Sequence, residues 1–314
     1  MPIPPSPRAR AFAPGSVGNV GPGLDILGLA LKGRGDVVEV ALRDGSGIEV
    51  LDAGHPELPR DPAHNTAALA TAAALRIGGS PDVGLHLTIT KGLPLSGGQG
   101  GSAASAVAGA VAANALLDLG LSEHQLVEAA LEAESHVAGR HLDNILPSLI
   151  GGIVLIRDAA SYDYVRMEAP KSLRVVLAQP EQRLRTAEGR AVLPDTVTRD
   201  VALYQAAQVA AMILAFTTND LTLLRRAVDD RIAEPARAPL LPGFVAAKRA
   251  ALEAGALGCS ISGSGPTAFA FAGDQADAME IAAAMKSAYE AEGIACSTRI
   301  SEVSPEGARI VEED

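Results

Sequence analysis

The stretch "PLSGGQGGSAASAVAGAVAANALL" (residues 94–117) is a glycine-rich turn followed by a long run of small, uncharged residues that predicts a buried helix. Glycine and serine let a ligand approach the backbone closely, and the first turn of a helix leaves several N–H groups without intrahelical partners. Because these donors and the helix dipole favour negative charge, phosphate is the expected ligand. The alternative is a turn that simply leads into a core helix, since a glycine-rich loop alone is a weak signal.

The loop matches neither of the two common nucleotide-binding patterns. It has no lysine at the position that GxxxxGK[ST] requires, and its glycines lack the GxGxxG spacing. A P-loop NTPase is therefore excluded, and the loop also fails the dinucleotide-binding pattern.

Composition limits the possible partners. The 314 residues suffice for two domains at roughly 150 residues each. Hydrophobic residues make up 48% and aromatics only 3%, with no Trp, so the core must be built from Ala, Val, Leu and Ile. The net charge of -11, with no run of Lys or Arg, argues against nucleic acid or an acidic membrane surface as a partner.

Several features predict a cytoplasmic protein. Cys259 and Cys296 form no framework of disulfides and are expected to be small buried hydrophobes in a reducing compartment. The N-terminus lacks the apolar segment of an export signal, and no uninterrupted stretch of about 18 apolar residues is expected to span a bilayer. The first seven residues, four of them proline, are expected to be a disordered leader.

The order of predicted elements indicates an α+β fold. Strands are expected at 36–44, 84–90, 151–156 and 173–180, and also near the segments CSISGSGPTAFAFA and ACSTRI. One helix is expected directly after the glycine-rich loop and another from Ser122 onward. Further helices are expected at 65–77, 200–216, 219–232, 243–255 and 275–292. Because these do not alternate as regular βα units, a doubly wound sheet is disfavoured. The polar segment 157–171 predicts a division into domains 1–165 and 166–314.

Polar residues gather in other segments besides the loop. In FAPGSVGNVGPGLDILGLAL (12–31), Asn19 and Asp25 lie among glycines, where Asx turns are the simplest interpretation. In EAALEAESHVAGRHLDNILPSLIGG (128–152), a metal trio of His136, His141 and Asp143 is conceivable, although histidines five residues apart share a helical face poorly.

These segments together resemble the GHMP kinases. PLSGGQGGSAAS resembles the family's PxxxGxGSSA signature, and GSVGNVGPGLDILGLAL resembles its N-terminal motif. Four further segments resemble, in the same order, members that phosphorylate homoserine: RHLDNILPSLIGG, RTAEGRAVLP, IAEPARAPLLPGF and ISGSGPTAFAF. The resemblance covers essentially the whole chain.

The resemblance implies a two-domain α+β GHMP kinase fold, with an N-terminal half like ribosomal protein S5 domain 2 and a ferredoxin-like C-terminal half. It implies ATP-dependent phosphorylation of the side-chain hydroxyl of L-homoserine, a step of threonine biosynthesis, in the cleft between the domains. Mg²⁺ is the implied metal and a homodimer the implied assembly. A GHMP kinase for another alcohol, such as mevalonate or a sugar, and a sensor that has lost catalysis are the alternatives.

The resemblance also assigns nucleotide-binding residues. Asn65 is placed near the base, and Ser102 and Glu134 are placed near Mg²⁺, for which oxygen ligands are suited. The ATP phosphates are assigned to the loop residues Pro94, Leu95, Ser96, Gly97, Gly98, Gln99, Gly100, Gly101, Ser102, Ala103 and Ala104.

On the substrate side, Arg190 and Arg237 resemble a clamp for the homoserine carboxylate, a task that suits the guanidinium fork. The same resemblance assigns Asp25, His141 and Asp143 to the amino group and the far end of the substrate, and Asn19 to the orientation of the hydroxyl. A site with arginines at one end and carboxylates at the other matches the charge pattern of a zwitterion.

Asn144 stands where some relatives have an aspartate base, and an amide cannot accept the proton at neutral pH. We therefore expect direct attack of the hydroxyl on the γ-phosphate, aligned by Asn144 and Thr186, with Asp143 as a base left open. The loop departs from the family pattern at Gly101, in place of a serine, and at Gln99, in place of an apolar residue. Loss of the hydroxyl could remove a phosphate hydrogen bond of roughly 0.5 to 3 kcal/mol.

Overall fold

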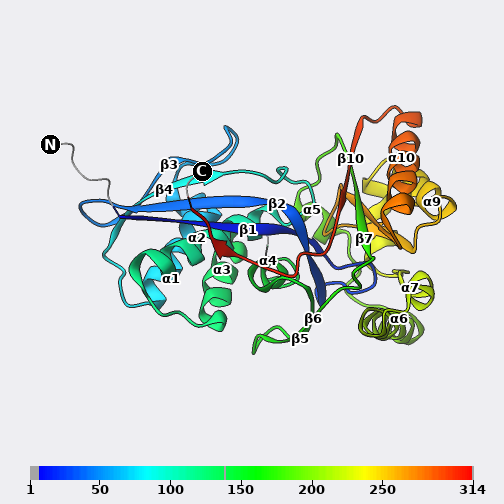
Figure 1. The fold of residues 1–314 in the computed structure, drawn as a ribbon, viewed down its shortest axis with the longest axis horizontal. Coiled ribbons are helices and arrows are strands. Elements are labelled where there is room, and N and C mark those ends of the chain that lie inside the picture. Colours follow the sequence, from blue (N-terminus) through cyan, green and yellow to red (C-terminus); the bar gives the residue numbers. More distant parts are fainter. Residues whose placement is uncertain (1–6, 138, 313–314) are drawn as a thin grey trace.

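A computed structural model describes residues 7–137 and 139–312, so most of the predicted leader lies outside the described residues. The chain forms two β-sheets with separate sets of helices (Figure 1). The strands of the first sheet are β1 (Arg8–Gly18), β2 (Leu27–Leu42), β3 (Gly47–Asp52), β4 (Gly84–Thr90), β5 (Ile153–Asp158), β6 (Asp163–Met167) and β11 (Arg309–Ile310). The strands of the second are β7 (Arg174–Pro180), β8 (Gly258–Ile261), β9 (Ala268–Ala272) and β10 (Cys296–Ser301).

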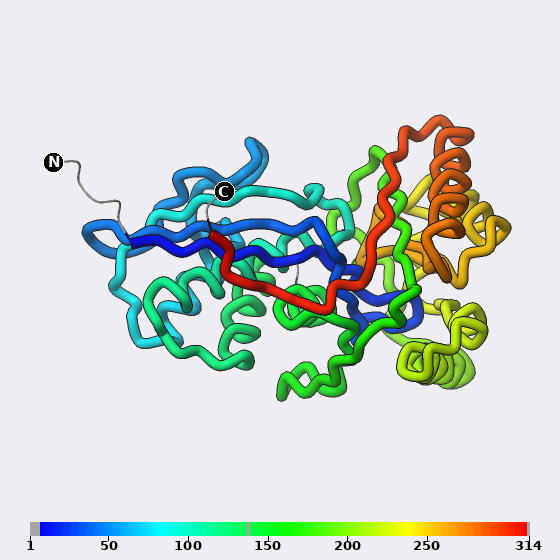
Figure 2. The backbone as a smooth tube through the Cα atoms, viewed as in Figure 1, coloured from blue at the N-terminus to red at the C-terminus, as the bar shows by residue number. Residues whose placement is uncertain are grey.

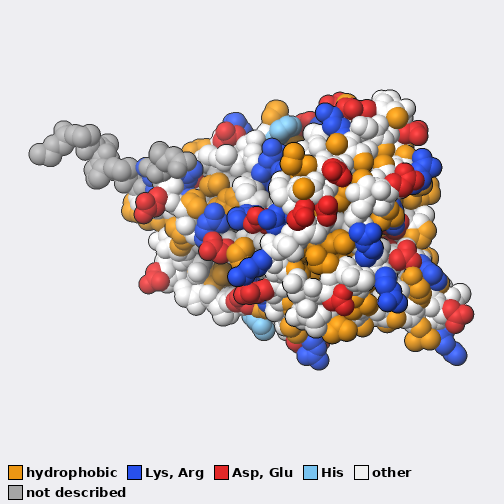
Figure 3. All heavy atoms as spheres, turned by 45° about the vertical axis from the view of Figure 1, so that its right-hand side comes forward, with side chains coloured by type: hydrophobic (Ala, Val, Ile, Leu, Met, Phe, Trp, Pro, Cys, Tyr) orange, Lys and Arg blue, Asp and Glu red, His pale blue; other side chains and the backbone are white. Residues whose placement is uncertain are grey.

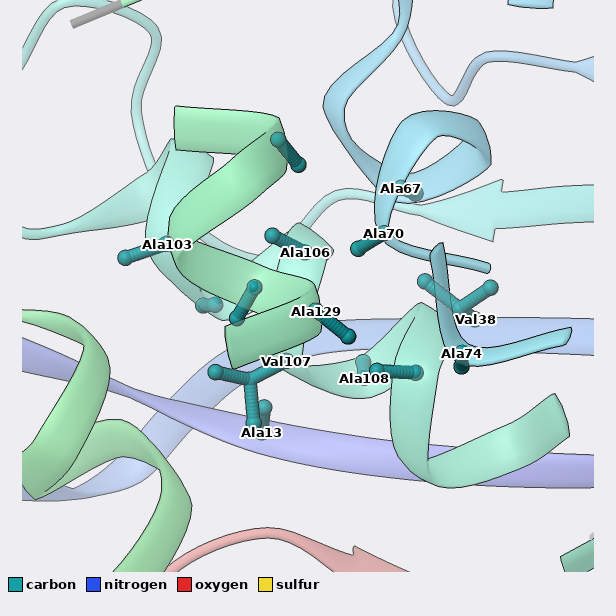
Figure 4. Packing of buried hydrophobic residues seen from close by; sticks show 14 of the residues in the cluster. Ala13, Val38, Ala67, Ala70, Ala74, Ala103, Ala106, Val107, Ala108 and Ala129 are labelled. Carbon is teal, nitrogen blue, oxygen red and sulfur yellow. The ribbon is translucent and has the colours of Figure 1, made fainter. Parts of the chain in front are cut away.

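The N-terminal half packs alanine-rich helices on the first sheet. These helices are α1 (Thr66–Ile77), α2 (Gly101–Leu117), α3 (Glu123–Val137) and α4 (Ile145–Ile150). Figure 4 shows α1, α2 and α3 meeting through alanines such as Ala70, Ala106 and Ala129, all fully buried. Because alanine side chains are short, helix backbones approach closely, which explains how a core without Trp fills its space. Gly109 of α2 lies against α1, where a Cβ would be 2.6 Å from the carbonyl oxygen of Ala67.

The second sheet has the strand order β10-β7-β9-β8, with every neighbouring pair antiparallel. Counted along the C-terminal half, this is the order 4-1-3-2 of a ferredoxin-like sheet, so the predicted architecture is confirmed. Helices α9 (Phe244–Glu253) and α10 (Gln275–Ala291) cover one face, while α6 (Arg199–Thr218) and α7 (Leu221–Ala227) pack on the other. The short helices α5 (Thr186–Ala191) and α8 (Ala233–Arg237) lie between β7 and α9 in the chain.

Most predicted elements are present, with local differences. The predicted strand at 84–90 is β4, and Ser122 caps α3 in a reciprocal pair with Gln125. The helix predicted over 219–232 is wrong beyond Ala227. There the Asp230 carboxylate accepts hydrogen bonds from the N–H groups of Ala233 and Glu234, which starts α8 in place of extending α7.

The end of the chain returns to the first sheet. Strand β11 pairs with β1, with Ile310 opposite Ala11, and Val303 bridges Leu31. Figure 2 shows this red segment lying along the blue N-terminal strands. Residues 309–310 therefore lie in the sheet of the N-terminal half, although they come at the end of the chain. The division into domains between residues 165 and 166 stays a prediction.

Helix α6 is apolar on average, although Gln205 and Gln208 interrupt its apolar residues. Within the described residues this one helix is long and apolar enough to cross a bilayer by length and composition alone, and 22% of the apolar window is buried. A single such helix is weak evidence for a span.

Candidate active site

A cleft of about 580 Å³ opens where the glycine-rich loop faces residues 183–187 and 263–264 of the C-terminal half. It gathers most of the residues predicted for the nucleotide and for catalysis. The predicted residues that line it are Asn65, Pro94, Leu95, Ser96, Gly97, Gly98, Gly100, Gly101, Ser102, Ala103, Glu134, His141, Asn144 and Thr186. Gln99 and Ala104 are the two loop residues outside this lining.

Backbone conformation shapes the loop. Gly98 and Gly100 have φ values of +71° and +67°, a region that favours glycine. A Cβ at Gly100 would lie 2.1 Å from Ser16 Oγ. Helix α2 begins at Gly101, and no side chain caps this end by a hydrogen bond. The start of α2 therefore faces the cleft with backbone donors that suit an anion.

The C-terminal half holds the loop in place. Ser262 donates a hydrogen bond to the carbonyl oxygen of Gly98 at 2.6 Å. Gln99, only 4% exposed, donates through Nε2 to Gln179 and Thr267 and accepts from Arg299 Nη2 at 3.1 Å. The Gln99 side chain is thus bound to strands β7 and β10 and to Thr267 directly before β9, and its departure from the family pattern serves contact between the two halves.

Glu134 fits a metal ligand. Its side chain is buried, and Oε1 has no hydrogen-bond partner. Burial raises the pKa of Glu134 to about 7, while the hydrogen bond from Ser102 and the charge of Lys91 act in the opposite direction. An unpartnered carboxylate oxygen beside a phosphate-binding loop is a donor that suits Mg²⁺, which takes one or two protein oxygens together with phosphate oxygens.

The alternative metal trio is not assembled. His136 is exposed on α3 and its Nδ1 lies 2.8 Å from the carbonyl oxygen of Glu132. Among residues 7–137 and 139–312, no group of three His, Cys, Asp or Glu side chains is arranged to hold a metal.

Lys91 was missed by the sequence reasoning. It lines the cleft, forms a close ion pair with buried Asp36, and donates to the carbonyl oxygen of Gly101 and to Ser105 Oγ, both at 3.0 Å. Asp36 also accepts from the N–H groups of Gly92 and Leu93. The sequence did contain a signal for this residue, because Lys91 directly follows strand β4 and lies three residues before Pro94.

Arg190 connects three predicted substrate residues. Its Nη1 and Nη2 donate to the Asp25 carboxylate at 2.6 and 2.7 Å, and Nη2 lies 3.1 Å from His141 Nδ1. Burial disfavours ionised Asp25, but the hydrogen bonds and charge of Arg190 outweigh it and lower the pKa of Asp25. Burial lowers the pKa of His141. Arg190 Nε is buried without a hydrogen-bond partner.

Arg237 and Asn19 meet at the second glycine-rich turn. Arg237 is 3% exposed, and its Nη1 and Asn19 Nδ2 both donate to the carbonyl oxygen of Gly263, at 2.9 and 2.8 Å. Arg237 Nε donates to the carbonyl oxygen of Gly189. Asn19 Oδ1 accepts from the N–H of Asp25 at 3.0 Å, six residues on, whereas an Asx turn reaches two residues on. These contacts fix the turn and occupy part of the predicted clamp.

Asp143 and Asn144 lie against strand β1. Asp143 Oδ2 accepts from the N–H of Asn19 at 2.9 Å, and Asn144 Oδ1 accepts from Ser16 Oγ at 2.9 Å. Burial, aided by the negative charge of Asp25, raises the pKa of Asp143 to about 6. Gly18 makes this approach possible, because a Cβ there would lie 2.5 Å from Asp143 Oδ2.

Both polar atoms of the Asn65 side-chain amide form hydrogen bonds within the fold. Oδ1 accepts from the N–H of Ala68 and thereby caps α1, and Nδ2 donates to the carbonyl oxygen of Pro59 at 2.9 Å. Asn65 lines the cleft, while its side-chain atoms serve the fold, and its place near the base stays a prediction.

A two-domain α+β fold with a glycine-rich phosphate cleft between its halves defines a small-molecule kinase of the GHMP class. The family model "GHMP kinases N terminal domain" matches residues 65–152, and "GHMP kinases C terminal" matches residues 212–291. Within that class, the chain belongs to the homoserine kinase family.

This assignment rests on similarity along nearly the whole chain. The homoserine kinase of Chlorobaculum tepidum is 39% identical, with 96% of this chain and 97% of the relative covered. That of Arabidopsis thaliana is 40% identical, covering 96% of this chain and 84% of the relative. The crystal structure of homoserine kinase from Cytophaga hutchinsonii superposes with a TM-score of 0.92 at 37% identity, covering 97% and 98%. A galactokinase from Lactococcus lactis, at 16% identity and a TM-score of 0.72, shares the fold.

Proposed function

We propose that the chain transfers the γ-phosphoryl group of ATP to the side-chain hydroxyl of L-homoserine, a step of threonine biosynthesis. The observation that carries the proposal is the junction of two sites in one cleft. His141 lines the cleft together with the glycine-rich loop, Asn144 and Thr186. His141 also contacts Arg190, which is paired with Asp25 behind it.

On the nucleotide side, we propose that the loop and the start of α2 hold the ATP phosphates through backbone N–H groups. Lys91 places a positive charge against the same loop, next to Gly101. Ser102 and Glu134 would hold Mg²⁺, which when bound neutralises charge on the phosphate oxygens. The base would lie toward Asn65, at the far end of the cleft wall.

On the amino-acid side, we propose that the carboxylate of homoserine binds the free Nε of Arg190 and the guanidinium of Arg237. The amino group then faces the carboxylates of Asp25 and Asp143, with Asn19 and His141 close by. This arrangement matches positive donors to one end of the zwitterion and negative acceptors to the other, which gives specificity for an amino acid over a neutral alcohol.

Transfer needs positioning more than strong base catalysis, because the transition state is loose. A bond forms between the homoserine hydroxyl oxygen and the γ-phosphorus, and the bond from that phosphorus to the oxygen of the departing ADP breaks. Asn144 and Thr186 align the reacting groups, and the hydroxyl proton passes to a phosphate oxygen or water. Asp143, whose pKa of about 6 leaves it largely ionised at neutral pH, is the side chain that could take the proton instead.

The direct test measures ATP consumption with Mg²⁺ and either L-homoserine, L-threonine, mevalonate or galactose. Loss of a buried charged contact costs about 1.5–3 kcal/mol, so turnover with homoserine should exceed that with mevalonate, which has no amino group, by about 10- to 100-fold. It should exceed that with galactose, which has neither charged group, by at least about 100-fold. L-threonine keeps both charged groups and tests the position of the hydroxyl. If mevalonate or galactose is turned over faster than homoserine, that alcohol is the substrate. If ATP and homoserine both bind without turnover, the protein is a sensor.

The predicted homodimer and the predicted cytoplasmic location also stay proposals. The homodimer is implied by the family resemblance, and sedimentation of the purified protein tests it. Fractionation of cells that express the chain tests the location.

A further inference from the structure

One of the buried side chains of α6 is polar. The buried residues of this helix recur at helical spacing, and Val209, Met212 and Phe216 are apolar, as a core-facing stripe requires. Gln205 occupies the preceding position of the same stripe, four residues before Val209, and is only 7% exposed. Because a buried amide costs free energy unless its hydrogen bonds are made, a glutamine at this position needs partners of its own.

Both polar atoms of the Gln205 amide are hydrogen-bonded. Nε2 donates to the carbonyl oxygen of Pro22 at 2.9 Å and to Asp230 Oδ1 at 2.8 Å, while Oε1 accepts from the N–H of Arg231 at 3.1 Å. Two acceptors face the nitrogen and one donor faces the oxygen, so only this orientation of the amide satisfies all three groups. Gln205 therefore joins α6 to two segments that lie far apart in the sequence.

The first of these segments carries Asp25. Pro22 lies between Asn19 and Asp25, and the side chain of Asn19 accepts a hydrogen bond from the N–H of Asp25. Asn19 and Asp25 have φ values of +65° and +63°, which residues other than glycine rarely adopt, so the loop needs contacts that hold it. The hydrogen bond from Gln205 to Pro22 supplies one of them, and it acts on the loop that sets where the Asp25 carboxylate lies.

The second segment carries Arg237. Asp230 accepts hydrogen bonds from the N–H groups of residues 232–234, and so it fixes the start of α8, a helix of five residues that ends at Arg237. Figure 3 shows charged side chains scattered over the surface of the molecule, whereas Asp230 and Arg237 are only 7% and 3% exposed. Such buried charges depend on their hydrogen-bond partners. Because α8 is short, a shift at Asp230 moves the arginine at the other end.

We propose that Gln205 is a positioning residue that sets the distance between the Asp25 carboxylate and the Arg237 guanidinium, and so matches the site to the amino group and carboxylate of an α-amino acid. The inference rests on the proposed function, in which these two side chains bind opposite ends of homoserine. Gln205 itself does not line the cleft. It acts through Pro22 on one side and Asp230 on the other.

Gln205→Met tests this role, because methionine resembles glutamine in length but lacks the amide donor and acceptor. A shift of about 1 Å in a binding group can cost about 100-fold, and we expect a smaller shift here, with a rise of about tenfold in KM for homoserine. KM for ATP should stay within about twofold of the parent value, because Gln205 contacts no residue of the phosphate loop. Equal rises in both KM values would overturn the proposal.

The matched control is Gln208→Met, the same change three residues further along α6. Gln208 is half-buried, and its amide forms no hydrogen bond with the part of the chain that the structure describes. Both KM values should therefore equal those of the parent.

A double-mutant cycle with Arg237→Ala separates positioning from a merely structural role. If Gln205 acts through the place of Arg237, Gln205→Met should raise KM for homoserine by about threefold or less once that guanidinium is gone, because coupled sites are not additive. A structural role would give the same tenfold rise in both backgrounds, since independent sites add. An equal rise in both backgrounds overturns the positioning role.

Gln205→Asn replaces methionine in the same cycle if thermal unfolding shows that Gln205→Met does not fold. Asparagine keeps a polar amide in the buried position, but its side chain is shorter by one methylene and cannot reach both segments, so KM for homoserine should again rise. Turnover of homoserine by the parent is measured first. An inactive parent overturns the proposed function together with this inference, whereas an active parent and an unchanged KM for homoserine in the folded variant overturn the positioning role alone.

Discussion

The two ends of the cleft are built from different parts of the polypeptide. The phosphate end is made of backbone: glycines at positive φ, a helix start without a side-chain cap, and carbonyl groups held from the other half. The amino-acid end is made of side-chain charges already paired with one another, as in the contact of Arg190 with Asp25. The first end depends on shape, and the second on a balance of buried charges.

This difference predicts how each end responds to substitution. Adding atoms to the phosphate end should block it, because neighbouring backbone and side chains leave no room. Removing a charged side chain from the amino-acid end should weaken binding of homoserine, and it should leave the oppositely charged side chain that it was paired with uncompensated. The four predictions below run from the largest expected effect to the smallest.

Gly100→Ala should cause the largest loss. The new Cβ would lie 2.1 Å from Ser16 Oγ and 3.0 Å from Asn144 Oδ1, so the loop or both of these residues must move. A shift of about 1 Å in a reacting group can cost about 100-fold in rate, and we expect at least that loss in kcat/KM for ATP. Steady-state kinetics at saturating homoserine measures it.

Gly120→Ala is the control for backbone strain. Gly120 has a φ of +64°, close to that of Gly100, but a Cβ there meets no atom within 4 Å. Its cost should be limited to about 1 kcal/mol of stability, with normal kinetics. Equal activity of Gly100→Ala and Gly120→Ala would show that the phosphate end tolerates added volume. The two ends of the cleft would then not differ in the way proposed.

Arg190→Ala and Arg237→Ala should act at the other end. Loss of a charge-assisted hydrogen bond to the carboxylate costs about 1.5–3 kcal/mol, so KM for homoserine should rise about 10- to 100-fold while KM for ATP stays nearly constant. Arg157→Ala, which removes an exposed guanidinium paired with Asp163 outside the cleft lining, is the control and should leave both KM values unchanged. Full catalytic efficiency in both variants would defeat the assignment of a carboxylate clamp.

Local features of this contrast were predictable from sequence, and distant ones were not. The loop, α2 and the cap at Ser122 follow from neighbouring residues, and the family motifs bring the right residues to one cleft. The pairing of Arg190 with Asp25 joins positions 165 residues apart, and Arg299 reaches Gln99 across 200 residues. Composition and periodicity contain no signal for such contacts. The family motifs therefore predicted Arg190 as a carboxylate clamp and Gln99 as a phosphate-binding residue, but they could not show the side chains with which these two residues are paired.

Asp143→Asn should change stability in a pH-dependent way. The pKa of Asp143 is raised from 3.8 to about 6 because the carboxyl group is buried. Between these values the folded protein retains a proton that the unfolded chain releases, so this contribution to stability is present below about pH 4 and is lost as pH rises through 6. Asparagine does not ionise, so the variant should gain roughly 2–3 kcal/mol relative to the parent between pH 4 and pH 7, from 1.36 kcal/mol per pH unit.

Urea denaturation at several pH values measures this gain. Asp82→Asn, the same substitution in an exposed turn, is the control for the change of residue type. Parallel curves for the parent and Asp143→Asn would mean that the buried carboxyl is not destabilised by ionisation. The same variant addresses the open question of the base, since a nearly unchanged kcat excludes Asp143 from proton transfer.

Gly101→Ser should produce the smallest effect, and it is the one addition that the phosphate end should accept. A Cβ at Gly101 meets Leu93 Cβ and Lys91 Nζ at 3.5 Å, an ordinary contact, and the position has no positive φ. The new hydroxyl would lie at the first turn of α2, beside the phosphates. A hydrogen bond worth about 0.5–1.5 kcal/mol should lower KM for ATP by about 2- to 10-fold.

Gly101→Ala separates the hydroxyl from the rest of the change. Alanine adds the same Cβ and the same gain in helix propensity, about 1 kcal/mol of stability, but no donor for a phosphate oxygen. Thermal unfolding should therefore respond similarly in both variants, while only serine should improve binding of ATP. If alanine and serine alter KM for ATP equally, the hydroxyl makes no phosphate contact. If serine worsens KM, even this position rejects added atoms and the phosphate end is closed to side chains throughout its glycines.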